Sequence, residues 1–281
     1  MQESYKKYFF LFALPTVLAF LIAFVIPFFM GIYLSFTEFT TVIDARWVGF
    51  SNYIKAFSAN NEFVNALWFT VKFTVVSVIS INLLAFTLAS ILTSGIKATN
   101  IFRTVFFMPN LIGGIVLGYI WQIIINGFLY KMEATLTTDP RYGFWGLVLL
   151  MNWQLIGYMM IIYIAGIQSI PVELIDSACV DGATPLQVLR HVTIPVVMPS
   201  FTICLFLTLT NSFRLFDQNL ALTAGAPSRK TAMLALDIYN TFYGKTNWEG
   251  VGQAKAVIFS ILVAVIAAGQ LFLTRSKEVE G

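Results

Sequence analysis

Six long apolar segments constrain this chain more than any other feature of its sequence. Each is long enough to cross the hydrocarbon core of a bilayer as a helix of about 20 residues. The segments lie at about 9–35, 64–92, 104–127, 145–168, 196–216 and 254–273. Charged residues make up only 11% of the chain, against about 25% in a soluble domain. The sequence therefore predicts an all-α membrane protein with six transmembrane helices.

The first segment begins like a secretory signal peptide, because Lys6-Lys7 precede an apolar run. The run continues from about Tyr8 to Ser35, beyond the roughly 7–15 apolar residues of a signal peptide. We therefore expect an uncleaved first span, in which Pro15 and Pro27 are candidate kink positions.

Six spans place both termini on the same side of the membrane. With the N-terminus inside, the inner segments and the outer loops hold seven basic residues each, and the shorter inner segments have the higher basic density. The outer loops include residues 36–63, with interfacial aromatic residues around Trp47–Tyr53, and a polar stretch at 217–250. Because no internal repeat or linker is visible, we expect one membrane domain over residues 1–281.

A polar stretch at residues 170–195 separates two of the apolar segments. Pro171 suits the first turn of a helix, and Asp181-Gly182 indicates a turn. Thr184 can cap a second helix that begins at Pro185, and Pro195 is expected to end that helix. The pattern predicts two short helices at an angle, which can grip a soluble partner. The alternative is an ordinary loop that contains a helix.

This stretch resembles the coupling motif of ABC-importer permeases of the maltose type, the segment that docks on the ATP-hydrolysing subunit. Asp176-Ser177-Ala178 stands where that motif has Glu-Ala-Ala, and Asp181-Gly182-Ala183 matches it intact. Leu189 stands where an aromatic residue is usual. The resemblance implies an ATPase-coupling set of Glu173, Asp176, Ser177, Ala178, Asp181, Gly182 and Ala183.

The resemblance extends over nearly the whole chain. Arg103–Pro109 resembles the start of the family's third span, and Asn152–Gly166 resembles its fourth. Phe213–Asp217 and Leu222–Pro227 resemble a signature of the first sugar-permease subunit, with Ala226 in place of the second glycine. The combination implies a carbohydrate importer, and the first rather than the second of its two permease subunits.

The partners of the chain follow from the same resemblance. They would be a second homologous permease, two ATPase subunits, an extracytoplasmic sugar-binding protein, membrane lipid and the carbohydrate itself. The chain would be a multi-pass protein of the bacterial plasma membrane with both termini cytoplasmic. It would bind no cofactor, because ATP and Mg would lie on the ATPase. The dispersed charge gives no indication of nucleic-acid binding.

Candidate sugar contacts come from polar positions within the spans, where a polar side chain is costly and usually faces a partner or a cavity. Helical spacing places Thr208, Asn211, Ser212 and Leu215 on one face. The resemblance implies that sugar contacts fall on this face and, across the pathway, on Met151, Gln154, Leu155 and Tyr158. The alternative is that these groups bond helix to helix. Asn82, Gln122 and Asn126 are also expected to be interhelical partners.

Two other classes of protein compete with the importer. An ion-coupled secondary transporter would place carboxylates at mid-membrane, and no Asp or Glu lies deep within the six segments. A membrane-embedded enzyme would need a catalytic cluster, and none is visible. The chain has no Gly-x-x-x-x-Gly-Lys-Ser/Thr phosphate loop, so it cannot itself hydrolyse ATP.

Lys72 and Arg214, the charges nearest the span interiors, are expected to snorkel to the interface. The alternative is that they attract an acidic sugar.

Overall fold

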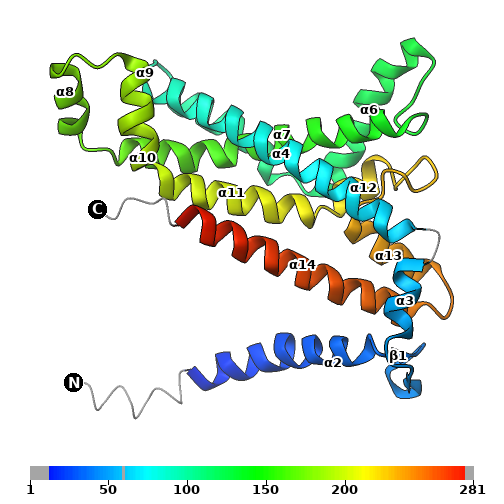
Figure 1. Cartoon of the computed structure of the whole chain (residues 1–281). Helices are drawn as coiled ribbons and strands as arrows, with labels where there is room; N and C mark the ends of the chain where they lie inside the picture. Colours follow the sequence, from blue (N-terminus) through cyan, green and yellow to red (C-terminus); the bar gives the residue numbers. More distant parts are fainter. Residues whose placement is uncertain (1–12, 59–60, 276–281) are drawn as a thin grey trace, which may run out of the picture. The chain divides into compact units, whose positions relative to one another are not determined.

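The fold is described from a computed structural model for residues 13–58 and 61–275. It is almost entirely helical (Figure 1). The chain forms two compact units, which are described separately. Unit 1 joins Ile238–Ser260 to the part that ends at Phe63, and unit 2 joins Val64–Asp237 to the part that begins at Ile261. The single domain expected over residues 1–281 stays a prediction.

The described chain contains five helical segments that are long and apolar enough to cross a membrane. They are Ala13–Leu34, Glu62–Thr93 (α4), Gly114–Met132, Pro140–Gln168 (α7) and Glu249–Thr274, the last within α14 (Glu249–Arg275). A sixth span is obtained when Pro185–Val196 and Met198–Phe213 are taken together, although the two parts meet at 70°. The six-span prediction is therefore confirmed with a broken fifth span. The expected start of the first span, at about residue 9, lies outside the described residues.

The third predicted span, 104–127, is interrupted, and the sequence analysis was wrong to treat it as one helix. Helix α5 (Thr99–Phe107) ends in the short 3-10 turn η3 (Met108–Leu111), and α6 (Gly114–Leu129) follows, extended by the 3-10 turn η4 (Tyr130–Met132). Pro109 lacks the N–H that a continuing α-helix needs. The extended backbone of Gly113 then starts α6 in a new direction.

The described part of unit 1 is helical from residue 13, and the π-helical turn η1 (Leu21–Val25) leads into α2 (Ile26–Leu34). A π-turn accommodates the missing N–H of Pro27. The kinks expected at Pro15 and Pro27 stay a prediction. A two-stranded hairpin follows: β1 (Thr37–Glu38) pairs antiparallel with β2 (Arg46–Trp47), and the 3-10 turn η2 (Val42–Asp44) lies between them. Helix α3 (Ser51–Ser58) completes the region.

The Asp44 side chain closes the hairpin turn. Its carboxylate accepts hydrogen bonds from the hydroxyl and backbone N–H of Thr40 and from the backbone N–H of Thr41. These bonds favour the ionised form and lower the pKa of Asp44 to about 2, the Thr40 hydroxyl contributing most. The turn therefore keeps its anionic cap throughout the physiological pH range.

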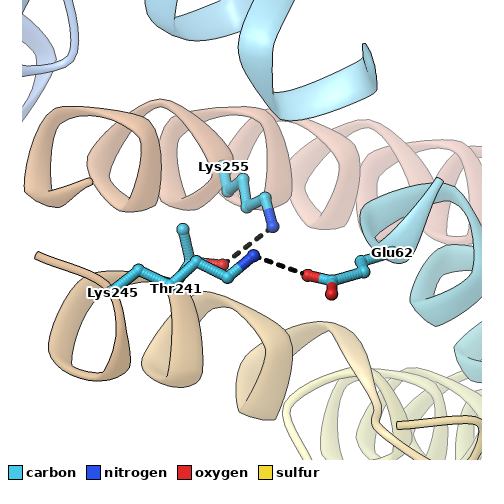
Figure 2. Close-up of polar contacts among 4 residues, drawn as sticks. All are labelled: Glu62, Thr241, Lys245 and Lys255. Atoms are coloured by element: carbon cyan, nitrogen blue, oxygen red, sulfur yellow. Dashed lines mark hydrogen bonds and ion pairs between the residues drawn. The ribbon is translucent and has the colours of Figure 1, made fainter. Parts of the chain in front are cut away.

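A polar cluster joins three helices inside unit 1 (Figure 2). Lys255 of α14 is only 1% exposed, and its Nζ donates to Oγ1 of Thr241, on α13 (Leu234–Gly244), at 2.8 Å. The same ammonium lies 5.5 Å from the ring centroid of Phe63, near the start of α4. Lys245 forms a partly exposed ion pair with Glu62 at 2.8 Å. A buried ammonium is costly unless polar partners surround it, so the cluster fixes how these helix ends meet.

The core of unit 2 is built around α7, which has fourteen buried residues. Small residues let its neighbours approach closely. A Cβ on Gly157 would lie 1.8 Å from the carbonyl oxygen of Phe106 in α5. On α6, Gly114 and Gly118 are spaced as in a Gly-x-x-x-Gly motif and lie against α12 (Asp217–Leu222), where a Cβ on Gly118 would meet Ala221 at 2.6 Å.

Residues 217–250 form more structure than the expected polar loop. They contain α12 and α13, and the segment between these helices is organised by the buried side chain of Asn219. Its amide donates to the Thr231 carbonyl and to the Thr223 hydroxyl, and its Oδ1 accepts from the backbone N–H of Met233. The segment folds inward because this one amide supplies the bonds that water would otherwise make.

Candidate functional site

Unit 2 contains a cavity of about 290 Å³ with a largely polar lining. Its lining comes from α7, from the end of α11 (Met198–Phe213), from the start of α12 and from η3. The lining residues are Asn110, Met151, Gln154, Leu155, Asn211, Arg214, Leu215 and Gln218. Amides and a guanidinium thus converge in a membrane chain whose other surfaces are mostly apolar, an arrangement expected of a site for a polar solute.

Hydrogen bonds hold the amides at the cavity. Gln154 Oε1 accepts from Gln218 Nε2 at 2.8 Å, which joins α7 to α12. Asn211 donates from Nδ2 to the Leu207 carbonyl in the preceding turn of its own helix, at 2.8 Å. Its Oδ1 and second N–H are left available to a ligand. Arg214 also lines the cavity, and its snorkelling to the interface stays a prediction.

The cavity brings together five of the eight candidate sugar contacts and leaves out three. Tyr158 lies one helical turn beyond Gln154, half-buried, with its ring centroid 6.3 Å from that of Phe107. Thr208 and Ser212, also on α11, are fully buried. Ser212 donates to the Thr208 carbonyl. Thr208 donates to the Cys204 carbonyl, and neither residue lines the cavity.

Two lining residues, Asn110 and Gln218, were not among the sequence candidates. Asn110 lies in η3, and the proline before it is the signal that the apolar run breaks there. Gln218 follows Arg214 by four residues, so helical spacing from Asn211 through Leu215 would have pointed towards it. Neither position shows up as an interruption of hydrophobic periodicity, because both lie at the ends of helical segments.

A buried chain of hydrogen bonds holds α11 against α4 and α7. The Tyr163 hydroxyl on α7 donates to Oδ1 of Asn82 on α4 at 2.7 Å. Nδ2 of Asn82 donates to the Thr208 hydroxyl on α11 at 3.0 Å and to the Val78 carbonyl. Asn82 thus bonds to α7, to α11 and to its own helix α4, which confirms it as an interhelical partner. Gln122 bonds to the Leu222 carbonyl of α12, whereas Asn126 bonds to a loop N–H, that of Leu136.

The polar stretch forms the two short helices that the sequence predicts. Helix α8 (Val172–Val180) ends at a turn in which Gly182 has φ +78°. Helix α9 (Pro185–Val188) begins with a capping box, in which Thr184 and Gln187 exchange hydrogen bonds. The candidate coupling residues lie on α8 and in this turn, where their side chains are exposed except for the half-buried Ala178 and Ala183. Their contact with an ATPase stays a prediction.

The helix after this turn does not end at Pro195 as expected. It continues through the π-turn η5 (Leu189–Thr193) and α10 (Ile194–Val196), and the chain bends at Val197 before α11 begins. A π-turn before a proline absorbs the lost backbone hydrogen bond, so Pro195 is accommodated within the helical segment. The bend at Val197 connects the exposed helical pair directly to the helix that carries Asn211.

A polytopic helical chain with a polar cavity and an exposed helical pair has the features of a membrane transport subunit. The chain belongs to the family described as binding-protein-dependent transport system inner membrane component, whose model matches residues 81–278.

Relatives match along nearly the whole chain. It is 45% identical to the probable starch degradation products transport system permease protein AmyD of Thermoanaerobacterium thermosulfurigenes, over 97% of this chain and 96% of the relative. It is 28% identical to the multiple sugar-binding transport system permease protein MsmF of Streptococcus mutans, over 94% of each.

A solved structure shows the same fold. A chain of a bacterial alginate ABC transporter, crystallised in complex with an alginate pentasaccharide-bound periplasmic protein, superposes with a TM-score of 0.82. The match covers 100% of this chain and 99% of that chain at 21% sequence identity. The fold is therefore that of an ABC-importer permease.

The Asn82 hydrogen bonds lead to a prediction about stability. Asn82→Leu keeps the approximate volume of the side chain but leaves the Tyr163 hydroxyl without its acceptor, which costs about 1–3 kcal/mol. We expect a lower thermal unfolding midpoint in detergent. Unfolding is measured by the reaction of buried Cys204 with a fluorogenic maleimide, in a protein in which Cys179→Ser has removed the exposed thiol.

The matched control is Ser90→Ala on the same helix, because the Ser90 hydroxyl bonds only to the Phe86 carbonyl of α4. It should leave the midpoint nearly unchanged. Combined with Thr208→Val, Asn82→Leu should lower the midpoint by less than the sum of the two single changes, since both remove the same bond. Strict additivity would show that the bond does not contribute to stability.

Proposed function

We propose that this chain is one of two permease subunits of an ATP-driven importer, and that it moves a carbohydrate into the cell after delivery by an extracytoplasmic binding protein. The observation that carries the proposal is the 45% identity over 97% of the chain to a permease named for starch degradation products. A second relative is named for multiple sugars. Short glucose oligomers released from starch are therefore the first substrates to test.

The chemistry of the cavity supports this class of substrate. Sugar hydroxyls both donate and accept hydrogen bonds, as do the amides of Asn110, Gln154, Asn211 and Gln218, which line the cavity. The apolar side chains of Met151, Leu155 and Leu215 can contact the C–H faces of a sugar ring. We propose these residues as the contacts, with Tyr158 next to them on α7. Arg214 adds donors for hydroxyls or for an acidic sugar.

The exposed helical pair supports coupling to a separate ATPase. Large apolar side chains lie exposed on α8 and α9: Val172, Leu174, Val180 and Leu186. Exposed apolar groups on a helix bordered by acidic residues are typical of a protein interface. In the proposed assembly, two ATPases bind ATP and Mg, a second permease completes the pathway, and both termini of this chain are cytoplasmic. The chain itself supplies no catalytic group.

An ion-coupled secondary transporter is the competing proposal. Such a protein needs titratable carboxylates or ion ligands in its pathway. None of the residues that line the cavity is acidic. This favours an energy source outside the chain.

The deciding experiment measures uptake of labelled maltooligosaccharide into proteoliposomes that contain the co-purified transporter. Uptake should require both ATP inside the vesicles and the binding protein outside. It should stop when the catalytic glutamate of the ATPase is replaced by glutamine. Uptake that continues without ATP hydrolysis but follows an imposed ion gradient would contradict the proposal.

Asn211→Leu should weaken sugar recognition without loss of folding. It removes an amide that faces the cavity at nearly constant volume, and loss of one good hydrogen bond corresponds to about a tenfold rise in the KM of uptake. Thr210→Val on the same helix is the control, because the Thr210 hydroxyl bonds to carbonyls of its own helix, Phe206 and Leu207. An equal rise in KM for both variants would remove Asn211 from the contact set.

Substitutions of Gly182 should separate backbone conformation from side-chain bulk in the coupling turn. A Cβ at this position meets nothing within 4 Å, so the constraint is its φ of +78°. Gly182→Val should nearly abolish uptake, because a β-branched residue rarely adopts this conformation. Gly182→Asn should retain most uptake, since Asn tolerates it. Membrane insertion is checked by the yield of monodisperse protein, and normal uptake by the Val variant would contradict this account of the turn.

A further inference from the structure

Helix α3 of unit 1 has its apolar side on the outside. Phe50, just before the helix, is 68% exposed, and Ile54 is 67% exposed. Phe57, spaced to lie on the same helical face, is exposed as well. By contrast, Asn52 is 3% exposed and Ala56 is fully buried. This orientation is the reverse of what a water-facing amphipathic helix shows.

The orientation of α3 is fixed by its buried polar face. Asn52 Nδ2 donates to the carbonyl oxygens of Ser35 and Thr37, at 3.0 and 2.8 Å. Gly250 of α14 packs directly on this contact, because a Cβ there would lie 2.2 Å from the Thr37 oxygen and 2.7 Å from Asn52 Nδ2. The helix cannot rotate to bury its apolar face without leaving two carbonyls and an amide unpaired.

The exposed face continues a row of aromatic rings that starts in the first span. Tyr33, in the last full turn of α2, lies 6.0 Å from Trp47 between ring centroids. Trp47 stacks on Phe36 at 5.4 Å, and Phe36 meets Phe50 at 5.3 Å. Trp47 is 64% exposed. The segment Ala13–Leu34 is itself exposed along nearly its whole length, as a lipid-facing helix would be.

These observations indicate that membrane lipid contacts the exposed face. The row leads without interruption from a membrane span to α3, and Trp and Tyr at the end of a span are typical of the membrane–water interface. Arg46 and Lys55, which flank the row, have stems long enough to reach lipid phosphates. We propose that α3 lies in the headgroup layer beside the first span, with Phe50, Ile54 and Phe57 directed into lipid. The proposal does not depend on which solute the chain transports.

Site-directed spin labelling of the whole transporter tests this placement. Cys179→Ser removes the exposed native thiol, and the buried Cys204 is retained. Nitroxide labels are then attached to Ile54→Cys and, as the control, to Lys55→Cys in nanodiscs of phosphatidylethanolamine and phosphatidylglycerol. Oxygen partitions into hydrocarbon and a nickel chelate does not. We expect the ratio of oxygen to nickel collisions at position 54 to exceed that at position 55 by about threefold or more.

Three results would overturn the proposal. Equal ratios at the two positions would place the face in water. Shielding of position 54 from both reagents would indicate a protein neighbour within the transporter. Shielding that develops only after addition of the binding protein would make the face a docking surface for that protein.

If the Ile54→Cys protein fails to assemble, quenching of tryptophan fluorescence by brominated lipid provides the second measurement. The quenched fraction should fall when Trp47→Phe removes the indole of the row. An unchanged fraction would place Trp47 away from lipid and overturn the proposal.

Discussion

The contact that the helix packing of unit 2 depends on most is the pair of hydrogen bonds made by Asn82. Within a bilayer no water is available to satisfy a polar side chain, so each must find its partner inside the protein. Asn82 accepts from Tyr163 on α7 and donates to Thr208 on α11. Around these bonds, the rings of Phe86, Tyr163 and Phe201 pack edge to face or tilted, with centroids 4.8 to 5.4 Å apart.

The cavity is a product of that packing. Thr208 and Ser212 are fully buried on α11, whereas Asn211 of the same helix and Leu215 just after it line the cavity. Rotating α11 about its axis would break the bond between Asn82 and Thr208 and displace Asn211 at the cavity. The same bonds that hold the bundle together therefore select which polar groups can meet a solute.

Much of the architecture follows from the sequence, and the exceptions have physical reasons. Span positions follow from the lengths of apolar runs, and the helical pair at 170–195 follows from Pro171, Gly182 and Thr184, because each demands a particular backbone conformation. Hydropathy averaged over a span does not show that Pro109 divides it, since the segments before and after the Pro109–Asn110 pair stay apolar. Nor can it show that Asn219 folds residues 223–233 inward, because that requires bonds from one side chain to the backbone at Thr231 and Met233. Sequence spacing places Thr208 and Ser212 near Asn211 on one helix, but it cannot show that their hydroxyls are bonded inside the bundle.

The bend at Val197 divides the helical segment from Pro185 to Phe213 into a short arm, Pro185–Val196, and a long arm, Met198–Phe213. In a straight helix, rotation about the axis would leave the far end where it was. Here the long arm leaves the short arm at 70°, so turning the short arm about its own axis sweeps the long arm sideways. With a rise of 1.5 Å per residue, Asn211 lies about 20 Å along that arm, and a turn of about 10° would carry it about 3 Å. A displacement of that size equals the length of a hydrogen bond. It would be enough to form or break a hydrogen bond between Asn211 and a solute in the cavity.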